Sequence, residues 1–341
     1  ANEKDLVKDG GPRAHVMIYE LQEAAPAYPQ IRSVTTEDGT PIGWGALSGL
    51  AADPARPGIL YAVNDSFYRM QPTIFTIDAT STPATIVKAT PVTRNGSPAQ
   101  KLDLEGIASD GKGGFWLASE GRTDRVIPHA IYHVDARGEI KKEIGLPPEL
   151  MAVEKRFGFE GITTVGTGDG LTLWMAVQRE WGDDEKGFVK LVSYVPKTKT
   201  WGAVRYRLDR GEAGWVGLSE ITAHGDHAYI VERDNRIGAA ARIKKLYRVA
   251  LSDMKPSPLG SPLPTVEKEL VRDFLPDLKA LNGFVVDKIE GFAIDAAGVG
   301  YAVTDNDGVD DSSGETLFFP IGKVASGTNV SASVPAPGPG R

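Results

Sequence analysis

The chain has 341 residues, 38 Lys and Arg against 45 Asp and Glu, a net charge of −7 and no cysteine. Non-specific nucleic-acid binding needs a basic surface, so the acidic balance argues against nucleic acid as a partner, and disulfides and Cys-ligated metals are excluded. No apolar run approaches the roughly 18 residues that mark a membrane-spanning helix. The 39 Gly and 23 Pro residues exceed their usual share of a chain and indicate many turns.

The N-terminal segment, residues 1–5, is polar and contains neither Met nor the apolar stretch of a signal peptide. This pattern indicates a processed mature N-terminus or a trimmed chain, and we expect the former. That expectation implies that a signal peptide has been removed and that the protein is exported, to the periplasm or the medium.

One motif recurs five times along the chain. It consists of an apolar residue, Ser or Glu, usually Gly, and a second apolar residue, and its copies begin near residues 47, 104, 159, 218 and 289. A turn and a second apolar run follow each copy, and further strand-like runs follow those. The last interval is wider because it contains a Pro-rich insertion at 255–264.

Short β-rich runs, grouped in fours at a regular period, are typical of β-propeller blades. We therefore predict an all-β fold, a β-propeller with five blades of four antiparallel strands around a central channel, in one domain over 1–325. A surplus N-terminal run leaves six blades as an alternative. We expect a run at 17–21 or 30–34 to close the ring by pairing with 317–320, and residues 326–341 to be a disordered tail or linker.

The first strand of a propeller blade lines the channel, so the Ser or Glu of all copies would converge on the axis. These residues are Ser48, Glu105, Glu160, Ser219 and Glu290. Converging carboxylates raise one another's pKa unless a counter-charge is present, and a cation is the simplest one. Oxygen-only ligands favour Ca²⁺, or another hard cation. The alternative is that the acids only bond the backbone of the neighbouring blade.

A wider ring of polar residues follows the second strands at the same mouth. Its acids include Asp65 and Glu120, and its arginines are Arg69, Arg122, Arg179 and Arg233. Because guanidinium groups suit bidentate contacts with phosphate, we expect Arg122 and Arg233 to clamp a phosphate and Asp65 or Glu120 to activate water. The alternative is that the arginines form ion pairs at the rim. Four tryptophans could form a stacking wall or pack between blades, namely Trp44, Trp181, Trp201 and Trp215.

The set of motifs resembles the phytase-like family of bacterial exported proteins, described by "esterase-like activity of phytase", over about 43–319. The matching stretches are LSGL at 47–50, LEGIA at 104–108 with WLASEG at 116–121, FEGI at 159–162, VERD at 231–234, and IEGFA at 289–293 with TDN at 304–306. This resemblance implies ester or phosphoester hydrolysis.

The order Ser, Glu, Glu, Ser, Glu is also similar to that of calcium-activated nucleotidases, or apyrases, which are five-bladed propellers with one central Ca²⁺. That second likeness implies that the five axial residues named above are the ligands. It also favours five blades over six.

Our first hypothesis is an exported, metal-dependent phosphoester hydrolase that binds a small phosphate ester at the channel mouth and acts as a monomer. The second is a non-catalytic propeller that uses Ca²⁺ for stability and binds a ligand or protein partner, because a fold does not fix a function.

Overall fold

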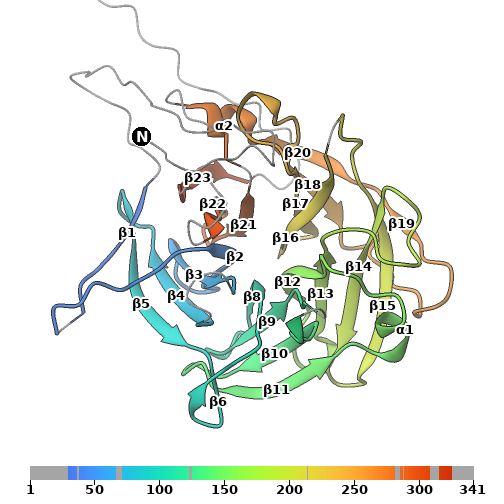
Figure 1. The fold of residues 1–341 in the computed structure, drawn as a ribbon, viewed down its shortest axis with the longest axis horizontal. Coiled ribbons are helices and arrows are strands. Elements are labelled where there is room, and N and C mark those ends of the chain that lie inside the picture. Colours follow the sequence, from blue (N-terminus) through green and yellow to red (C-terminus); the bar gives the residue numbers. More distant parts are fainter. Residues whose placement is uncertain are drawn as a thin grey trace, which may run out of the picture.

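Five small sheets form a ring around a common axis, which is the architecture of a five-bladed β-propeller (Figure 1). The computed structural model describes residues 30–36, 38–66, 71–122, 125–212, 214–280, 285–286, 288–307 and 315–324. The prediction of an all-β propeller with five blades is thereby confirmed, and the six-bladed alternative is wrong.

The strands of a blade follow one another in the chain from the axis outward. Blade 1 contains β2 (Leu47–Ala52), β3 (Ile59–Asn64), β4 (Thr73–Asp78) and β5 (Ala84–Pro91). Blade 2 contains β8 (Leu104–Ser109), β9 (Phe115–Ser119), β10 (Ala130–Val134) and β11 (Ile140–Gly145). Blade 3 contains β12 (Phe159–Val165), β13 (Thr172–Val177), β14 (Phe188–Val195) and β15 (Thr200–Arg207).

Blade 4 contains β16 (Val216–His224), β17 (His227–Asp234), β18 (Lys244–Ala250) and β20 (Glu269–Asp273). The described strands of blade 5 are β21 (Ile289–Ile294), β22 (Val299–Thr304) and β23 (Phe318–Lys323). Short elements between successive blades are β6 (Thr93–Arg94), β7 (Ser97–Pro98), α1 (Pro148–Met151) and α2 (Leu275–Lys279). Within blades, η3 (Gly168–Gly170) connects β12 to β13, and η4 (Gly238–Ala240) connects β17 to β18. No helix in the described ranges has the length and hydropathy needed to cross a membrane.

Two parallel strands extend blades beyond the predicted four. β1 (Ile31–Ser33) pairs with β5 at the outer edge of blade 1, so the run at 30–34 does not pair with the C-terminal run as proposed. β19 (Thr265–Val266) pairs with β15 of blade 3, and β20 follows at once in blade 4, so one segment joins the two blades. The other run proposed to close the ring, 17–21, and the tail 326–341 lie outside the described residues.

The apolar core lies between blades and not within any one of them. Each of the five buried clusters combines residues of two neighbouring blades. Leu191 of blade 3 shares a cluster with Leu218 of blade 4, and Phe75 of blade 1 shares one with Val303 of blade 5. Burying such a side chain contributes about 1.5–3 kcal/mol. The last cluster therefore joins the beginning and the end of the ring.

The recurring motif brings the inner strands unusually close together. Every inner strand has a register shift at the motif, and such bulges bend a strand and redirect its side chains. A Cβ atom on Gly49 would lie 2.6 Å from the carbonyl oxygen of Glu105 in the next blade, which no side chain tolerates. Glycine is therefore required there for the close approach that brings the acids to the axis.

Candidate functional site

The channel mouth forms where each inner strand begins and the second strand of its blade ends. The N–H of Asp65 donates to the carbonyl of Ala46 (3.0 Å), and the N–H of Glu120 donates to that of Asp103 (2.9 Å). The corresponding bond recurs in blades 3 and 5. The polar residues that follow the second strands consequently lie beside the starts of the inner strands.

Three of the axial residues form a buried carboxylate cluster. One oxygen each of Glu105, Glu160 and Glu290 lies within 4.8 Å of the others. The hydroxyl of Ser48 donates to Glu105 Oε2 (2.6 Å) and lies 3.4 Å from Glu290 Oε2. Burial, and then the charges of neighbouring acids, raise the pKa of Glu105 and of Glu160 well above the usual value. Without a counter-charge these carboxyls therefore tend to hold protons.

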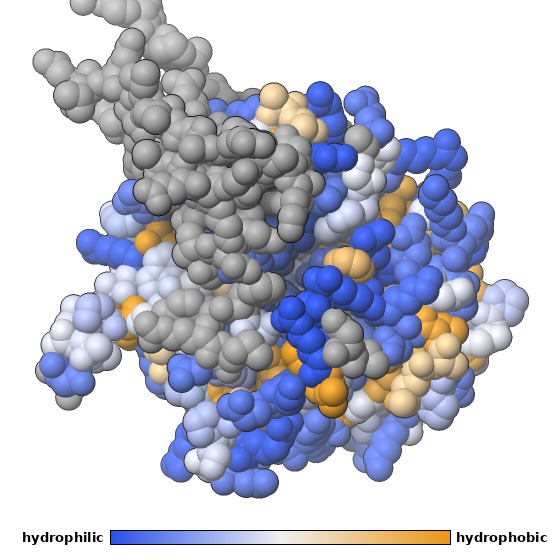
Figure 2. All heavy atoms as spheres, in the orientation of Figure 1, coloured by the Kyte–Doolittle hydropathy of each residue, from blue (hydrophilic) through white to orange (hydrophobic). Residues whose placement is uncertain are grey.

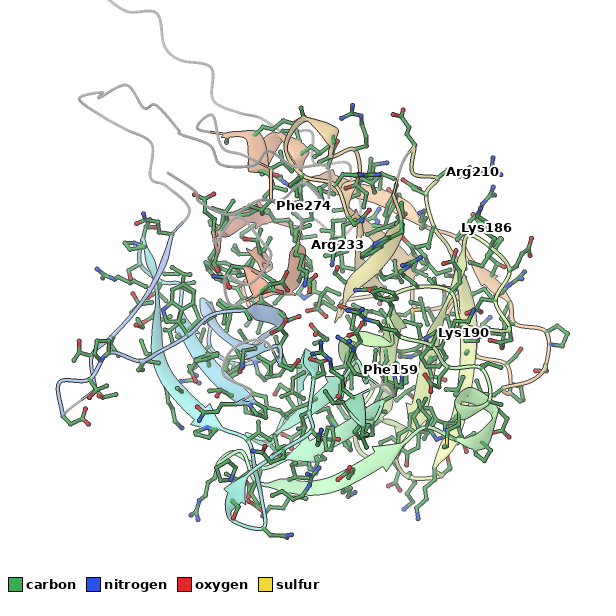
Figure 3. All side chains as sticks on the ribbon, viewed as in Figure 1. Phe159, Lys186, Lys190, Arg210, Arg233 and Phe274 are labelled. Carbon is green, nitrogen blue, oxygen red and sulfur yellow. The ribbon has the colours of Figure 1, made fainter. Side chains whose placement is uncertain are left out.

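The remaining part of the ring already has a cation from the protein itself. Arg233, whose side chain is 2% exposed, donates from Nε to the hydroxyl oxygen of Ser219 (3.0 Å) and from Nη2 to Glu290 Oε1. Figure 3 shows Arg233 beside the axis. The guanidinium of Arg233 thus binds Ser219 and one oxygen of Glu290. Arg233 therefore lies inside the ring, so the prediction that it clamps a phosphate at the exposed mouth is not supported by its position.

Two buried oxygen acceptors of the axial site lack a hydrogen-bond donor. Gln178 Nε2 donates to Glu160 Oε1 (2.6 Å), whereas Glu160 Oε2 and Gln178 Oε1 are buried with no partner. An orphaned buried oxygen is costly unless a donor or cation satisfies it. Carboxylate, amide and hydroxyl oxygens are the donor set of Ca²⁺. The residues present thus fit a hard cation held by Ser48, Glu105, Glu160 and Gln178.

A second acidic group extends the cluster into blade 2. One oxygen each of Asp103, Glu105 and Glu120 lies within 4.8 Å of the others, so Glu105 belongs to both groups. Burial, and next the charge of Asp103, raise the pKa of Glu120 to about 8. Glu120 can consequently exchange a proton close to neutral pH, which suits a general acid or base.

A third acidic group lies between blades 1 and 5 and includes its own cation. One oxygen each of Asp65, Asp305 and Asp307 lies within 4.8 Å of the others. Lys288 Nζ is 3.5 Å from Asp305 Oδ2 and also forms an ion pair with Asp307. The neighbouring acids raise the pKa of Lys288 well above its usual value although burial lowers it. Asp65 thus lies in a group that the protein itself partly neutralises.

The other residues predicted for the mouth differ in their surroundings. Arg122 is buried, and its N–H donates to the carbonyl of Ile127 (2.8 Å). Arg69 lies outside the described residues. Of the four tryptophans, Trp181 is in the core between blades 2 and 3, whereas the indole of Trp215 lies against the guanidinium groups of Arg179 and Arg233.

The fourth copy of the motif has Glu220 where the others have glycine. Its side chain crosses the axis: Oε2 accepts from the N–H of Leu50 in blade 1 (2.9 Å), and Oε1 accepts from the N–H of Ile221 (2.9 Å). Burial raises the pKa of Glu220 well above the usual value, although bonds from the backbone of Leu50, Ile221 and Phe292 lower it. One carboxyl group thereby ties together the bulged strands of blades 1, 4 and 5.

Three residues of this site were not predicted from the sequence, namely Asp103, Gln178 as a candidate ligand, and Lys288. Asp103 and Lys288 share a position, two residues before the Glu of their motif copies. The carbonyl of that position accepts the backbone bond described above. This position, read across the repeats, is the signal that could have identified both.

Comparison with known proteins gives a family. A family model described as "Phytase-like: Esterase-like activity of phytase" matches residues 42–308. A search of curated proteins finds no match.

Several solved structures are similar to this chain at low sequence identity. A luciferin-regenerating enzyme is 13% identical with a TM-score of 0.41, and the match covers 82% of this chain and 78% of that chain. The major Malassezia sympodialis allergen Mala s 1 is 14% identical with a TM-score of 0.42, covering 86% and 81%. A Bacteroides ovatus protein, titled xyloglucan PUL GH43B, is 13% identical with a TM-score of 0.46, covering 87% of this chain and 53% of that one.

Proposed function

Because the chain belongs to the phytase-like family, described by "esterase-like activity of phytase", we propose that it is a metal-dependent hydrolase of phosphate esters. The observation that carries the proposal is the pair of orphaned acceptors, Glu160 Oε2 and Gln178 Oε1, in a buried carboxylate ring. Ser48, Glu105, Glu160 and Gln178 would hold the cation, for which Ca²⁺ is the best candidate. When bound, such a cation neutralises charge on a phosphoryl oxygen and acidifies a bound water.

The protein's own residues would position the substrate and transfer a proton. Arg233 orients Glu290 and Ser219 through its two bonds and keeps part of the ring neutral. Glu120, with a pKa raised to about 8, is the best candidate to take up or give up a proton beside the axial cluster. Asp65 is a second candidate, and Arg122 remains the proposed phosphate contact from blade 2. An exported, monomeric protein remains part of this proposal.

Turnover with and without cation tests the proposed function. Protein stripped with EDTA should release little phosphate from p-nitrophenyl phosphate or from a panel of phosphate esters, and adding CaCl₂ should restore release. Glu105→Gln and Glu160→Gln should abolish that stimulation. Glu149→Gln, an exposed position on α1, is the matched control and should retain it. Release that is unaffected by EDTA, or absent from the native protein under all conditions, would contradict the proposal.

The second candidate function is a propeller in which the cation is only structural. The buried ion pair between Arg233 and Glu290 favours this second function. The guanidinium neutralises part of the ring, and unlike a catalytic cation it offers no coordination position to a substrate. In that case Glu160→Gln would remove the stabilisation by CaCl₂, while no phosphate ester would be turned over by the native protein.

A further inference from the structure

Guanidinium groups and aromatic rings alternate in a row from exposed Arg156 to buried Arg233. The guanidinium carbon of Arg156 lies 5.0 Å from the centroid of the Phe157 ring. Arg179 follows between Phe157 (4.7 Å) and Trp215 (5.0 Å). Arg233 lies 5.2 Å from the same Trp215 ring. Stacking of this kind holds guanidinium groups in fixed positions.

Arg179 is the half-buried arginine of this row, and it attracts the neighbouring Glu180 without forming an ion pair with it. No carboxylate in the described ranges forms an ion pair with it, and its Nε is buried without an acceptor. The neighbouring Glu180 instead accepts from the N–H of Gly187 (2.9 Å). A half-buried cation without an anion is unfavourable, and a guanidinium is well suited to bind a phosphate. Arg179 is therefore available to bind an anion from solution.

A cleft of about 820 Å³ opens beside Arg179, between blades 3 and 4. Arg179 and Trp215 form its inner wall, and Lys186, Arg207 and Arg210 line it further out. Figure 3 shows Lys186 and Arg210 in the same outer sector of the ring, and the surface there is largely hydrophilic (Figure 2). Within the described part of the chain, none of these three outer cations has a carboxylate within ion-pair distance.

Two of the three acids that line the same cleft already have other cations as partners, and the third is Glu180. Asp209 forms ion pairs with Lys245 (2.7 Å) and Lys268 (2.9 Å). Glu185 lies 3.5 Å from Arg205. The four lining cations thus exceed the unneutralised negative charge in the cleft, and their field favours an anionic ligand.

We propose that this cleft is an anion-binding subsite for a second phosphate or sulfate group of the ligand whose first group lies at the axial site. Arg179 and Arg233 flank one indole ring, so the subsite and the carboxylate cluster lie side by side. This inference rests on the proposed function and narrows its substrate class to small esters that carry at least two tetrahedral oxyanion groups.

Calorimetric titration with inorganic tripolyphosphate and with orthophosphate, in EDTA, tests the subsite without the axial cation. We expect tripolyphosphate to bind at least tenfold more tightly than orthophosphate, because it contacts several cations. Arg179→Gln and the double variant Arg207→Gln with Arg210→Gln should each weaken tripolyphosphate binding about tenfold or more. Arg137→Gln, an exposed arginine in a distant turn of blade 2, removes the same charge and should leave binding unchanged.

Tryptophan fluorescence locates the bound anion. Tripolyphosphate should change the emission of the native protein, and Trp215→Phe should lose that change while it keeps the calorimetric affinity, because a ring still stacks on Arg179. The proposal is overturned if the double variant binds like the native protein, or if Arg137→Gln loses as much affinity. If the native protein turns over no phosphate ester but the binding pattern holds, the proposed function fails and the subsite stands.

Discussion

The axial carboxylates predict a link between calcium, pH and stability. At 4.8 Å, the separation within which the oxygens of Glu105, Glu160 and Glu290 lie, two full charges repel by about 3.5 kcal/mol at an effective dielectric constant of about 20. Arg233 offsets the charge of Glu290, which leaves the pair Glu105 and Glu160. Proteins of this kind are stable by only about 5–15 kcal/mol. Without a bound cation, full ionisation of the cluster would therefore remove a large part of the free energy of unfolding.

The sign of the pH effect follows from the direction of the shifts. The folded protein raises the pKa of Glu105, Glu160 and Glu120, so it binds more protons than the unfolded chain above pH 4.5, and its stability falls as the pH rises. In EDTA we expect the melting temperature to fall between pH 5 and pH 9. One ionised pair corresponds to about 7–14 °C, at about 2–4 °C per kcal/mol.

Calcium should remove this fall, because binding replaces the protons with a cation. Differential scanning calorimetry at pH 5, 7 and 9, with EDTA or with CaCl₂, measures both effects. Calcium should stabilise the protein strongly at pH 9 and little at pH 5. Glu160→Gln should reduce both the slope in EDTA and the response to calcium, and Glu149→Gln should change neither. Melting curves at pH 9 that coincide with and without calcium would refute the reasoning.

Three further predictions concern the frame of the site. Gly49→Ala places a Cβ atom 2.6 Å from a carbonyl oxygen and should lower the free energy of unfolding in urea by about 3 kcal/mol. Gly145→Ala, where a Cβ has nothing within 4 Å, is the control and should lower it by less than about 0.5 kcal/mol. Equal unfolding midpoints for the two variants would contradict the packing argument. Glu220→Ala removes the acceptor of the N–H groups of Leu50, Ile221 and Phe292 and should cost about 3 kcal/mol or more, at about 1–3 kcal/mol per buried group. A smaller loss in the same assay would contradict the role of Glu220 as a buried acceptor. Asp53, whose pKa is lowered to about 2 by Arg56 and Tyr61 against the effect of burial, stabilises the fold above its unfolded pKa. Asp53→Asn should therefore cost about 1–2 kcal/mol at pH 7 and clearly less at pH 2, where the carboxyl of the folded protein is about half protonated, and a cost that stays constant across this range would exclude the ionic explanation.

The sequence predicts the inner part of the propeller well, because one motif carries both the axial acid and the glycine that lets strands approach. Every inner strand begins within two residues of its predicted start. The outer edges are harder to predict. The three residues of β1 and the two of β19 carry too little pattern to specify a partner, and both add in parallel to a blade edge.

The partners of the charged groups in the site could also not be predicted from the sequence. Arg233 lies near the end of the second strand of blade 4, a position compatible with an exposed clamp, but its long side chain reaches Glu290 of the next blade. In the sequence, Glu220 is only an irregular residue of the motif. Its hydrogen bond with Leu50, 170 positions away, forms only because the ring of blades is closed. Side-chain reach across the axis depends on tertiary structure and not on spacing in the chain.

The packing of blade 5 against blade 1 has a consequence for how the protein folds. The cluster that contains Phe75 and Val303 joins residues more than 200 positions apart. Loop closure over such a length is slow, so blades 1 to 4 should associate first as an open arc with two exposed apolar edges. Until the last blade docks, those edges are available to other chains, and the carboxylates of Glu105 and Glu290 have not yet been brought together. Aggregation during refolding should therefore depend on the rate of ring closure.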